Sequence, residues 1–250
     1  MPVRAIVGTS IGALLGAAYA DGISVGDLCD LGRRVRIRDF LRFQTSHAGH
    51  DKQKKDCIGQ FVQEWFRTQR LEELSIPTAI VSTDLDTGAP FVLTKGPLEV
   101  AIRASCAFPG LVKPVEYEGR LLGDGCIAAA VPTAIAAGMY GGFVLGVSVG
   151  SSLKSSSSGD IVKIFNSDLR SSVERIMAPT WCRRADILLE PQVQHIDWND
   201  FTQVDEAFSA GAEAMRRALS LMRELLAHQP RGSRAHAQGM SFAADRGSAC

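Results

Sequence analysis

The sequence predicts an α/β fold, a three-layer α/β/α sandwich built around a mostly parallel central sheet. Short apolar runs that suit buried strands alternate along it with segments of helical periodicity, and this alternation favours parallel strands joined by helices. The chain has 250 residues, long enough for one large domain of this class. Its composition, 46% hydrophobic and 22% charged, is typical of an ordinary globular protein.

The first predicted elements are a strand and a helix joined by a tight turn. Residues 4–7 form a short apolar run, and residues 11–20 are rich in Ala and Leu. Gly22 ends this helix, and Ser24 is a suitable cap for a second one. Residues 51–69 have the clearest amphipathic helical pattern, and we expect their apolar stripe to face the core.

The remaining elements are predicted from the same two periodicities. The expected strands are 78–82, 90–93, 142–149 and 185–189, and the expected helices are 97–105, 131–137, 161–177 and 204–227. Residues 142–149 are the best candidate for a central parallel strand, because they are suited to burial on both faces. We predict one domain over residues 1–228 and a disordered tail over 229–250, which is dominated by Gly, Ser, Arg and His.

Charge and cysteine content exclude several classes of function. The 27 basic and 27 acidic side chains balance, so we expect no nucleic-acid partner. The six cysteines form no CxxC pair, which argues against a zinc site or a redox motif. Scattered thiols favour a reducing compartment, and we predict a cytoplasmic protein. Residues 127–150 carry no charge and are long enough to span a membrane, but the glycine pair in their middle favours a helix, a turn and a strand.

A GxSxG sequence follows the first predicted strand. Such a sequence places a serine on a sharp strand-to-helix turn, where side chains on the flanking glycines would clash. The helix that follows directs its N-terminal dipole and N–H groups at the same place. We therefore predict that Ser10 is a nucleophile, on an elbow formed with Gly8, Thr9, Ile11 and Gly12. The alternative is a glycine-rich helix start without chemistry.

A serine nucleophile needs a base, and the residues alone leave two arrangements open. One is a triad of Ser10, Asp124 and His195, although all five histidines lie in polar segments that are typical of solvated side chains. The other uses Asp124 alone. Asp124 and Gly125 follow an apolar run, and a carboxylate among apolar neighbours can act as a general base. A plain Asp-Gly turn would give the same sequence.

Five motifs, in order, resemble those of the patatin-like phospholipase family, including its bacterial and NTE-type members. They are the elbow at 8–13, the Ser-Thr-Asp-Leu-Asp-Thr-Gly segment at 82–88, the Arg-Ala-Ser-Cys-Ala-Phe-Pro-Gly segment at 103–110, the pair Asp124-Gly125, and residues 185–189 with Asp197, Trp198 and Phe201. The resemblance extends over most of the chain.

The resemblance implies a serine acyl hydrolase of the phospholipase, lysophospholipase or carboxylesterase type. Ser10 would be the nucleophile and Asp124 the proton acceptor of a Ser–Asp dyad, with Gly125 in the loop that holds the Asp. The implied substrate is a lipid acyl ester, met during transient contact with a membrane surface. No metal and no organic cofactor is implied. The fold implied is the patatin-like α/β/α sandwich.

The chain departs from the family pattern in two places. The family's oxyanion hole comes from a Gly-rich loop that follows the family's first strand, ahead of the elbow. This sequence begins about one strand before Ser10, so we expect the family's first strand and its loop to be absent from it. Further on, Cys126 and Ala130 stand where the family has Gly and Asn. Three interpretations stay open: an active hydrolase, an impaired relative that binds lipid or a partner protein, and a protein whose true start lies upstream.

Overall fold

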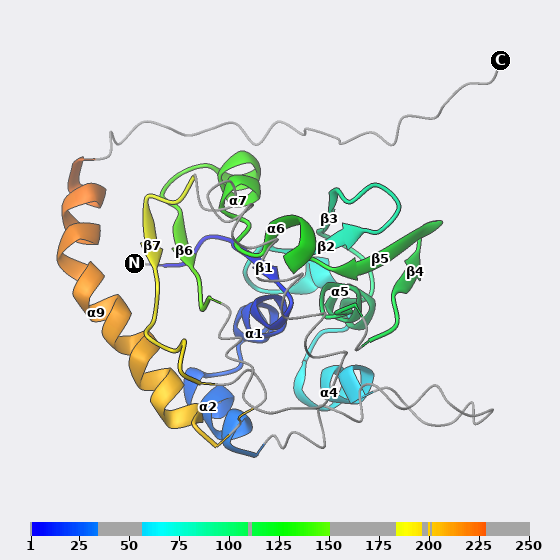
Figure 1. Ribbon diagram of the computed structural model, residues 1–250, viewed down its shortest axis with the longest axis horizontal. Coiled ribbons are helices and arrows are strands. Elements are labelled where there is room, and N and C mark those ends of the chain that lie inside the picture. The colour runs from blue at the N-terminus through cyan, green and yellow to red at the C-terminus, as the bar shows by residue number, and fades with distance from the viewer. Residues whose placement is uncertain are drawn as a thin grey trace.

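The computed structural model describes residues 2–34, 57–109, 112–150, 184–196, 200 and 202–228. The order of elements is traced in Figure 1. They are β1 (Ile6–Thr9), α1 (Ile11–Ala20), α2 (Val25–Arg34), α4 (Cys57–Trp65), a 3-10 helix (Leu71–Glu73), β2 (Thr78–Asp84), β3 (Pro90–Leu93), α5 (Leu98–Ser105), β4 (Val115–Tyr117), β5 (Arg120–Asp124), α6 (Cys126–Ala129), α7 (Thr133–Tyr140), β6 (Leu145–Val147), β7 (Ile187–Leu189) and α9 (Val204–His228).

The first strand, β1, belongs to a mixed sheet of five strands. Its order is β1-β2-β5-β4, with β3 also paired to β2. β1 runs parallel to β2, and this register places Thr9 beside Val81. β3 and β5 pair antiparallel with β2, and β4 pairs antiparallel with β5 through a tight turn at Glu118 and Gly119. The predicted α/β class is confirmed; parallel pairing is found at β1–β2 and in the separate two-stranded sheet of β6 and β7.

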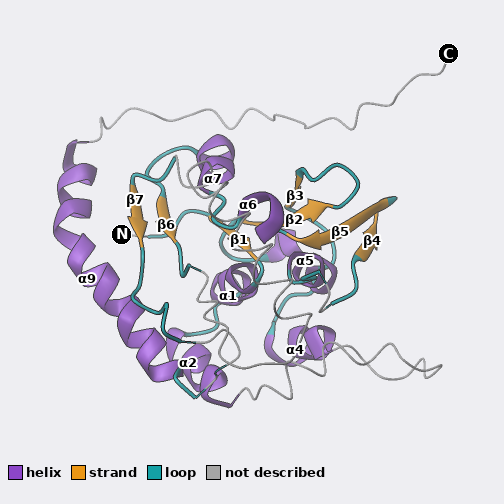
Figure 2. Ribbon diagram, viewed as in Figure 1, coloured by secondary structure: helices purple, strands orange, loops and turns teal. Residues whose placement is uncertain are grey.

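Helices cover both faces of the sheet and make the three layers (Figure 2). Because side chains alternate along a strand, Ile80 and Val81 of β2 point to opposite faces. Ile80 packs in the larger core, which includes buried side chains of α1 and α5 such as Ala17 and Ile102. Val81 packs in a smaller core with Ala129 of α6 and Ile135 of α7. The strand that runs beside β1 is therefore buried along its whole length.

Small residues let α1 lie close against the sheet. Ala13, Ala17 and Ala18 are fully buried, and a Cβ at Gly16 would come within 2.7 Å of a methyl carbon of Ile6. The bounds of α1 are the predicted ones. The predicted cap of α2 is also confirmed, because the Asp27 N–H donates to the Ser24 hydroxyl oxygen.

Several predicted elements differ from those observed. The helix predicted at 51–69 ends at Trp65, and the strand predicted at 185–189 spans only Ile187–Leu189. The strand predicted at 142–149 is shorter, since β6 spans only Leu145–Val147 and pairs with β7 alone among the described strands. Leu145 and Val147 are 38% and 53% exposed, so the predicted burial on both faces is wrong for the described structure. The helix predicted at 131–137 begins only after Pro132, which lacks an N–H to continue the preceding helix. The first strand ends two residues later than predicted, because β1 stays paired with β2 as far as Thr9. Residues 51–56, 161–177 and 229–250 lie outside the described residues.

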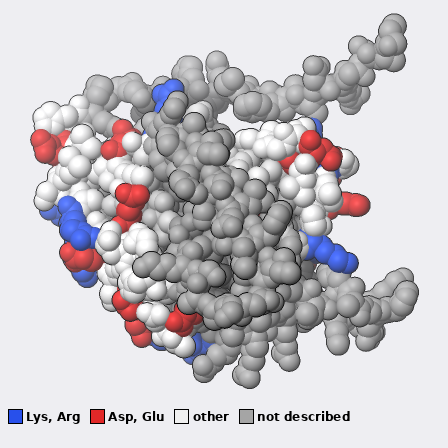
Figure 3. All heavy atoms as spheres, viewed as in Figure 1, with Lys and Arg blue, Asp and Glu red and all other residues white. Residues whose placement is uncertain are grey.

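The face of the molecule drawn in Figure 3 carries described residues of both signs of charge. On the face drawn in Figure 3, basic and acidic side chains are interspersed among the residues that are coloured. This distribution fits the zero formal net charge of the chain. Among the helices that the structure describes, none combines the length and apolar character needed to cross a membrane.

Candidate active site

Ser10 lies between the end of β1 and the start of α1. Its backbone has a φ of 53° and a ψ of −127°, which places a non-glycine residue in the left-handed half of conformational space. Such a conformation costs about 1–3 kcal/mol and persists only where its surroundings hold it. The chain reverses so sharply here that a Cβ at Gly8 would lie 2.6 Å from the Gly12 carbonyl oxygen. The predicted strand-turn-helix context of the elbow is therefore present.

The two glycines of the elbow differ in what surrounds them. Gly8 has backbone atoms of Gly12 and Ala13 within 2.8 Å of the position a Cβ would take, so only glycine fits. At Gly12 no described atom outside the helix's own backbone comes within 4 Å of that position. Among the described atoms, the expectation that both flanking glycines prevent a clash is correct for Gly8 and wrong for Gly12.

The hydroxyl of Ser10 donates a hydrogen bond to the Oδ2 atom of Asp124, with an oxygen-to-oxygen distance of 2.7 Å. Asp124 is the last residue of β5 and is 2% exposed, whereas Ser10 is half-buried. The other carboxylate oxygen accepts the N–H of Cys126 at 2.9 Å. The two residues that sequence analysis selected, 114 positions apart, are thus in direct contact.

The pairing of β2 with β5 brings Asp124 to this place. Asp124 lies opposite Ser82, and the hydroxyl of Thr83 donates to the Asp124 carbonyl at 2.7 Å. The same hydroxyl accepts the N–H of Ala128. Gly125 follows at a point where a Cβ would lie 2.1 Å from the Val81 carbonyl oxygen, so no other residue fits without a shift of the backbone.

The segment after Asp124 is held although Cys126 and Ala130 replace the glycine and asparagine of the family pattern. Cys126 supplies its backbone N–H to Asp124, which is a bond that any non-proline residue can make. Thr9, next to Ser10, donates its hydroxyl to the Ala129 carbonyl at 2.8 Å. The elbow and the Asp loop are therefore tied to each other on both sides of the Ser10–Asp124 contact.

The histidines that the structure describes make their contacts elsewhere. The Nε2 atom of His195 lies 2.6 Å from the Oε1 atom of Glu206, and both side chains are more than half exposed. The Nδ1 atom of His228 contacts the carbonyl of Glu224. His47, His50 and His236 lie outside the described residues. This geometry favours the arrangement in which Asp124 contacts Ser10 without an imidazole between them.

A cysteine thiol adjoins the serine. Desolvation raises the pKa of the Cys106 thiol, the negative charge of Asp124 raises it further, and a side-chain contact with Ser10 acts in the opposite direction. Because the net effect is a raised pKa, the thiol stays protonated at neutral pH. Cys106 is therefore a neutral neighbour, and Ser10 is the group with a carboxylate in position to accept its proton.

Sequence reasoning did not select every residue that builds the site. It used Ser105 only within a family motif, yet the Ser105 hydroxyl accepts the Ser10 N–H at 2.8 Å. It gave Thr83 no role beyond its place in another motif, although Thr83 holds the Asp124 carbonyl. These contacts join positions far apart in the chain. The only sequence signal for either residue was its place in a motif that resembles the family pattern.

Taken together, the fold and the site define a class: an α/β protein in which a serine on a strand-to-helix turn hydrogen-bonds a buried carboxylate. The model of the family described as patatin-like phospholipase matches residues 1–137, which is more than half of the chain. The chain belongs to the patatin-like phospholipase family.

Relatives of the chain are found in bacteria and in mammals. It is 35% identical over 150 residues to an uncharacterized NTE family protein of Mycobacterium tuberculosis, a match that covers 59% of this chain and 41% of that protein. A second such protein of the same organism is 26% identical over 254 positions, covering 88% and 42%. Patatin-like phospholipase domain-containing protein 7 of Rattus norvegicus is 28% identical over 165 residues, covering 60% and 12%. The chain thus spans less than half the length of these relatives.

Proposed function

We propose that this chain is a serine acyl hydrolase of lipid esters in which Ser10 is the nucleophile and Asp124 the proton acceptor. The observation that carries the proposal is the hydrogen bond of 2.7 Å from the Ser10 hydroxyl to the buried Asp124 carboxylate. A serine hydroxyl is a weak nucleophile unless a base takes its proton. Membership of a phospholipase family supports the choice of an ester bond in a lipid as the target.

The proposed reaction has two halves. Ser10 Oγ attacks the ester carbonyl carbon while its proton passes to Asp124, and the tetrahedral intermediate then collapses as the alcohol leaves with that proton. The acyl group remains on Ser10 as an ester. Water attacks this ester next, again giving a proton to Asp124, and the return of that proton to Ser10 Oγ releases the fatty acid and restores the hydroxyl.

The start of α1 is suited to stabilise the oxyanion. The N–H groups of Ala13 and Leu14 both donate to the Ser10 carbonyl. The first N–H groups of a helix have no intrahelical partner, so those of Ile11 and Gly12 are the donors next to the nucleophile. The positive end of the helix dipole adds to their effect. We assign them the role of oxyanion donors, and no described atom outside the helix crowds Gly12, which suits an approaching substrate.

An exposed apolar stripe on α1 supports a lipid substrate. Ile11, Leu15 and Tyr19 follow one another at intervals of four residues and therefore share a face of the helix. They are 53%, 43% and 42% exposed. A mostly apolar helix is usually buried on every side, so this stripe, which starts beside the nucleophile, suits contact with an acyl chain.

Turnover of p-nitrophenyl butyrate tests the proposal. Ser10→Ala removes the nucleophile and Asp124→Asn removes the base, and we expect each to lower kcat by on the order of 10²–10⁴. Asp21→Asn is the matched control, because Asp21 is also a buried carboxylate, 4% exposed, but accepts the Arg67 N–H at the far end of α1. This control should lose some thermal stability and keep its rate per folded molecule.

The result separates the proposal from its alternatives. Equal turnover by the wild type, Ser10→Ala and Asp124→Asn would overturn the assignment of both residues. A folded wild type that turns over no ester would instead favour the second hypothesis, a relative that binds lipid or a partner protein without catalysis.

A further inference from the structure

The end of α5 contacts both members of the Ser10–Asp124 pair. Ser105, the last residue of α5, accepts the Ser10 N–H through its hydroxyl oxygen at 2.8 Å. Two residues later, the carbonyl of Ala107 accepts the Asp124 N–H at 2.9 Å, and the carbonyl of Ser105 accepts the Gly125 N–H at 3.4 Å. The nucleophile and its base are therefore both attached to residues 105–107.

The hydroxyl of Ser105 acts as donor and acceptor at once. While it accepts the Ser10 N–H, it donates to the Val81 carbonyl of β2 at 2.6 Å. Ser105 is fully buried, so water is not in place to substitute for either bond. Through this one oxygen the backbone of Ser10 is fixed to the strand that also positions Asp124.

The hydrogen bond from the Ser10 N–H to Ser105 holds a strained part of the backbone. Ser10 has a φ of 53°, and a strained conformation persists only where neighbouring groups determine it. The bond also occupies the Ser10 N–H, so that this group does not face the substrate. The oxyanion donors then follow Ser10 in the chain, at Ile11 and Gly12.

We propose that Ser105 is a positioning residue for the reaction of Ser10. Its hydroxyl holds the backbone of the nucleophile so that Oγ points at Asp124, and it acts through Ser10 without touching the substrate. This inference rests on the proposed function for its effect on rate, whereas its effect on the Ser10 backbone is independent of any activity.

Ser105→Ala tests the proposal, with Ser82→Ala as the matched control. Both serines are fully buried: Ser82 lies within β2, and Ser105 contacts that strand. The Ser82 hydroxyl, however, is without a hydrogen-bond partner in the described structure. We expect Ser105→Ala to lower kcat for p-nitrophenyl butyrate by about 10- to 100-fold with KM unchanged, because a small displacement of a reacting atom costs that much. Ser82→Ala should leave both constants unchanged.

Amide hydrogen exchange at Ser10 gives a second measurement that needs no turnover. In the wild type we expect the Ser10 amide to be protected, to exchange faster in Ser105→Ala, and to keep its protection in Ser82→Ala. If the wild type hydrolyses no ester, the proposed function fails while exchange still decides the role of Ser105. An unprotected Ser10 amide in the wild type would overturn the inference. So would a Ser105→Ala protein with the kcat and Ser10 exchange of the wild type.

Discussion

Two groups of polar contacts in this molecule differ in their burial. Around Ser10 the partners are hidden from water: Asp124 is 2% exposed, Thr83 is 1% exposed and Ser105 is fully buried. Their bonds join β2, β5, α5 and the elbow, which are far apart in the sequence. A buried donor or acceptor that loses its partner costs about 1–3 kcal/mol, because water does not replace it.

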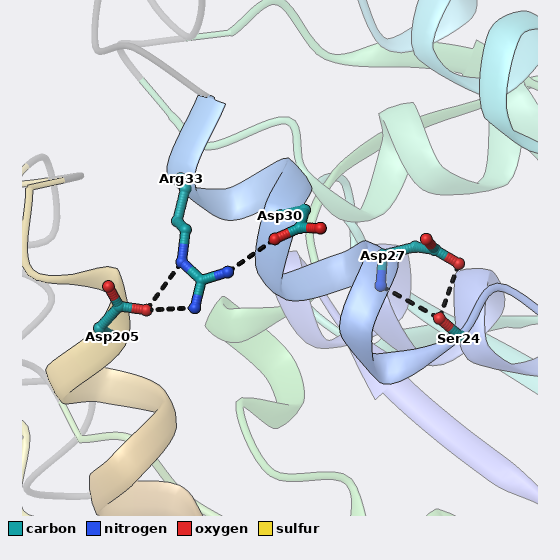
Figure 4. A network of polar contacts seen from close by, with 5 residues as sticks. All are labelled: Ser24, Asp27, Asp30, Arg33 and Asp205. Carbon is teal, nitrogen blue, oxygen red and sulfur yellow. Dashed lines mark hydrogen bonds and ion pairs between the residues drawn. The ribbon is translucent and has the colours of Figure 1, made fainter.

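The contacts between α2 and α9 lie on the surface instead. Arg33 at the end of α2 bonds Asp205 in the first turn of α9 and Asp30 in its own helix, while Ser24 and Asp27 cap the start of α2 (Figure 4). The side chains of the two ion pairs are 51–71% exposed. Exposed ion pairs contribute little, since water and salt compete for the same charges. The comparison teaches that substitutions in the buried contacts around Ser10 should lower stability and turnover more than substitutions in the exposed ion pairs of Arg33.

The largest effect is expected at Gly125. Gly125→Ala places a Cβ 2.1 Å from the Val81 carbonyl oxygen, the same oxygen that accepts the Ser105 hydroxyl, so β2 or the Asp loop must shift. We expect a loss of turnover of about 100-fold or more, with a lowered melting temperature. Thermal unfolding and ester turnover measure both.

Gly12→Ala is the control for Gly125→Ala. It adds the same methyl group where no described atom outside the helix's own backbone lies within 4 Å, and alanine favours a helix by about 1 kcal/mol over glycine. Its melting temperature should equal or exceed that of the wild type. Equal melting temperatures for the two variants would contradict the conclusion that a side chain is crowded at Gly125 and not at Gly12.

A smaller effect, present at neutral pH and lost in acid, is expected at Asp84. The hydrogen bond from Arg120 lowers the pKa of the Asp84 carboxyl, with help from the backbone N–H groups of Thr87 and Asp86. Because the folded pKa is depressed, the carboxylate stabilises the protein at neutral pH, and this contribution is lost as pH falls below about 4 towards the folded value. Asp84→Asn should be less stable at pH 7 and lose less stability on acidification. Urea midpoints at pH 7 and pH 3 test this, and parallel curves for the two proteins would contradict it.

The smallest effect is expected at Arg33. Arg33→Ala removes both exposed ion pairs of Figure 4, and we expect the melting temperature to stay within about 2 °C of the wild type. The difference should shrink further in 0.5 M salt, because salt screens exposed charges. Turnover should be unchanged. A loss of stability as large as that of Gly125→Ala would mean that the α2–α9 contact matters as much as the site.

Sequence reasoning succeeded where the determinants are local. The elbow and α1 follow from the spacing of glycines and from an Ala- and Leu-rich run, and both can be read within a dozen residues. Asp124 could be selected because it ends an apolar run and precedes a glycine. In these places the residues that determine the structure are neighbours in the chain.

What sequence reasoning missed depends on pairing between distant segments. The antiparallel register that sets Asp124 opposite Ser82 is fixed by which strand lies beside β2, and no local pattern specifies it. The role of Ser105 likewise depends on the end of α5 meeting the elbow 95 residues away. Leu145 and Val147 lie in an apolar run that predicts burial, but their exposure depends on which distant segments pack against that face of β6.

The most direct test of the account is labelling with a fluorophosphonate, which forms a covalent adduct only with an activated serine. Mass spectrometry of the folded wild type should find one adduct, located on Ser10. The adduct should form much more slowly in Asp124→Asn and at the wild-type rate in Arg33→Ala. A folded wild type that stays unlabelled, or that reacts at another serine, would contradict the assignment of Ser10 as the nucleophile.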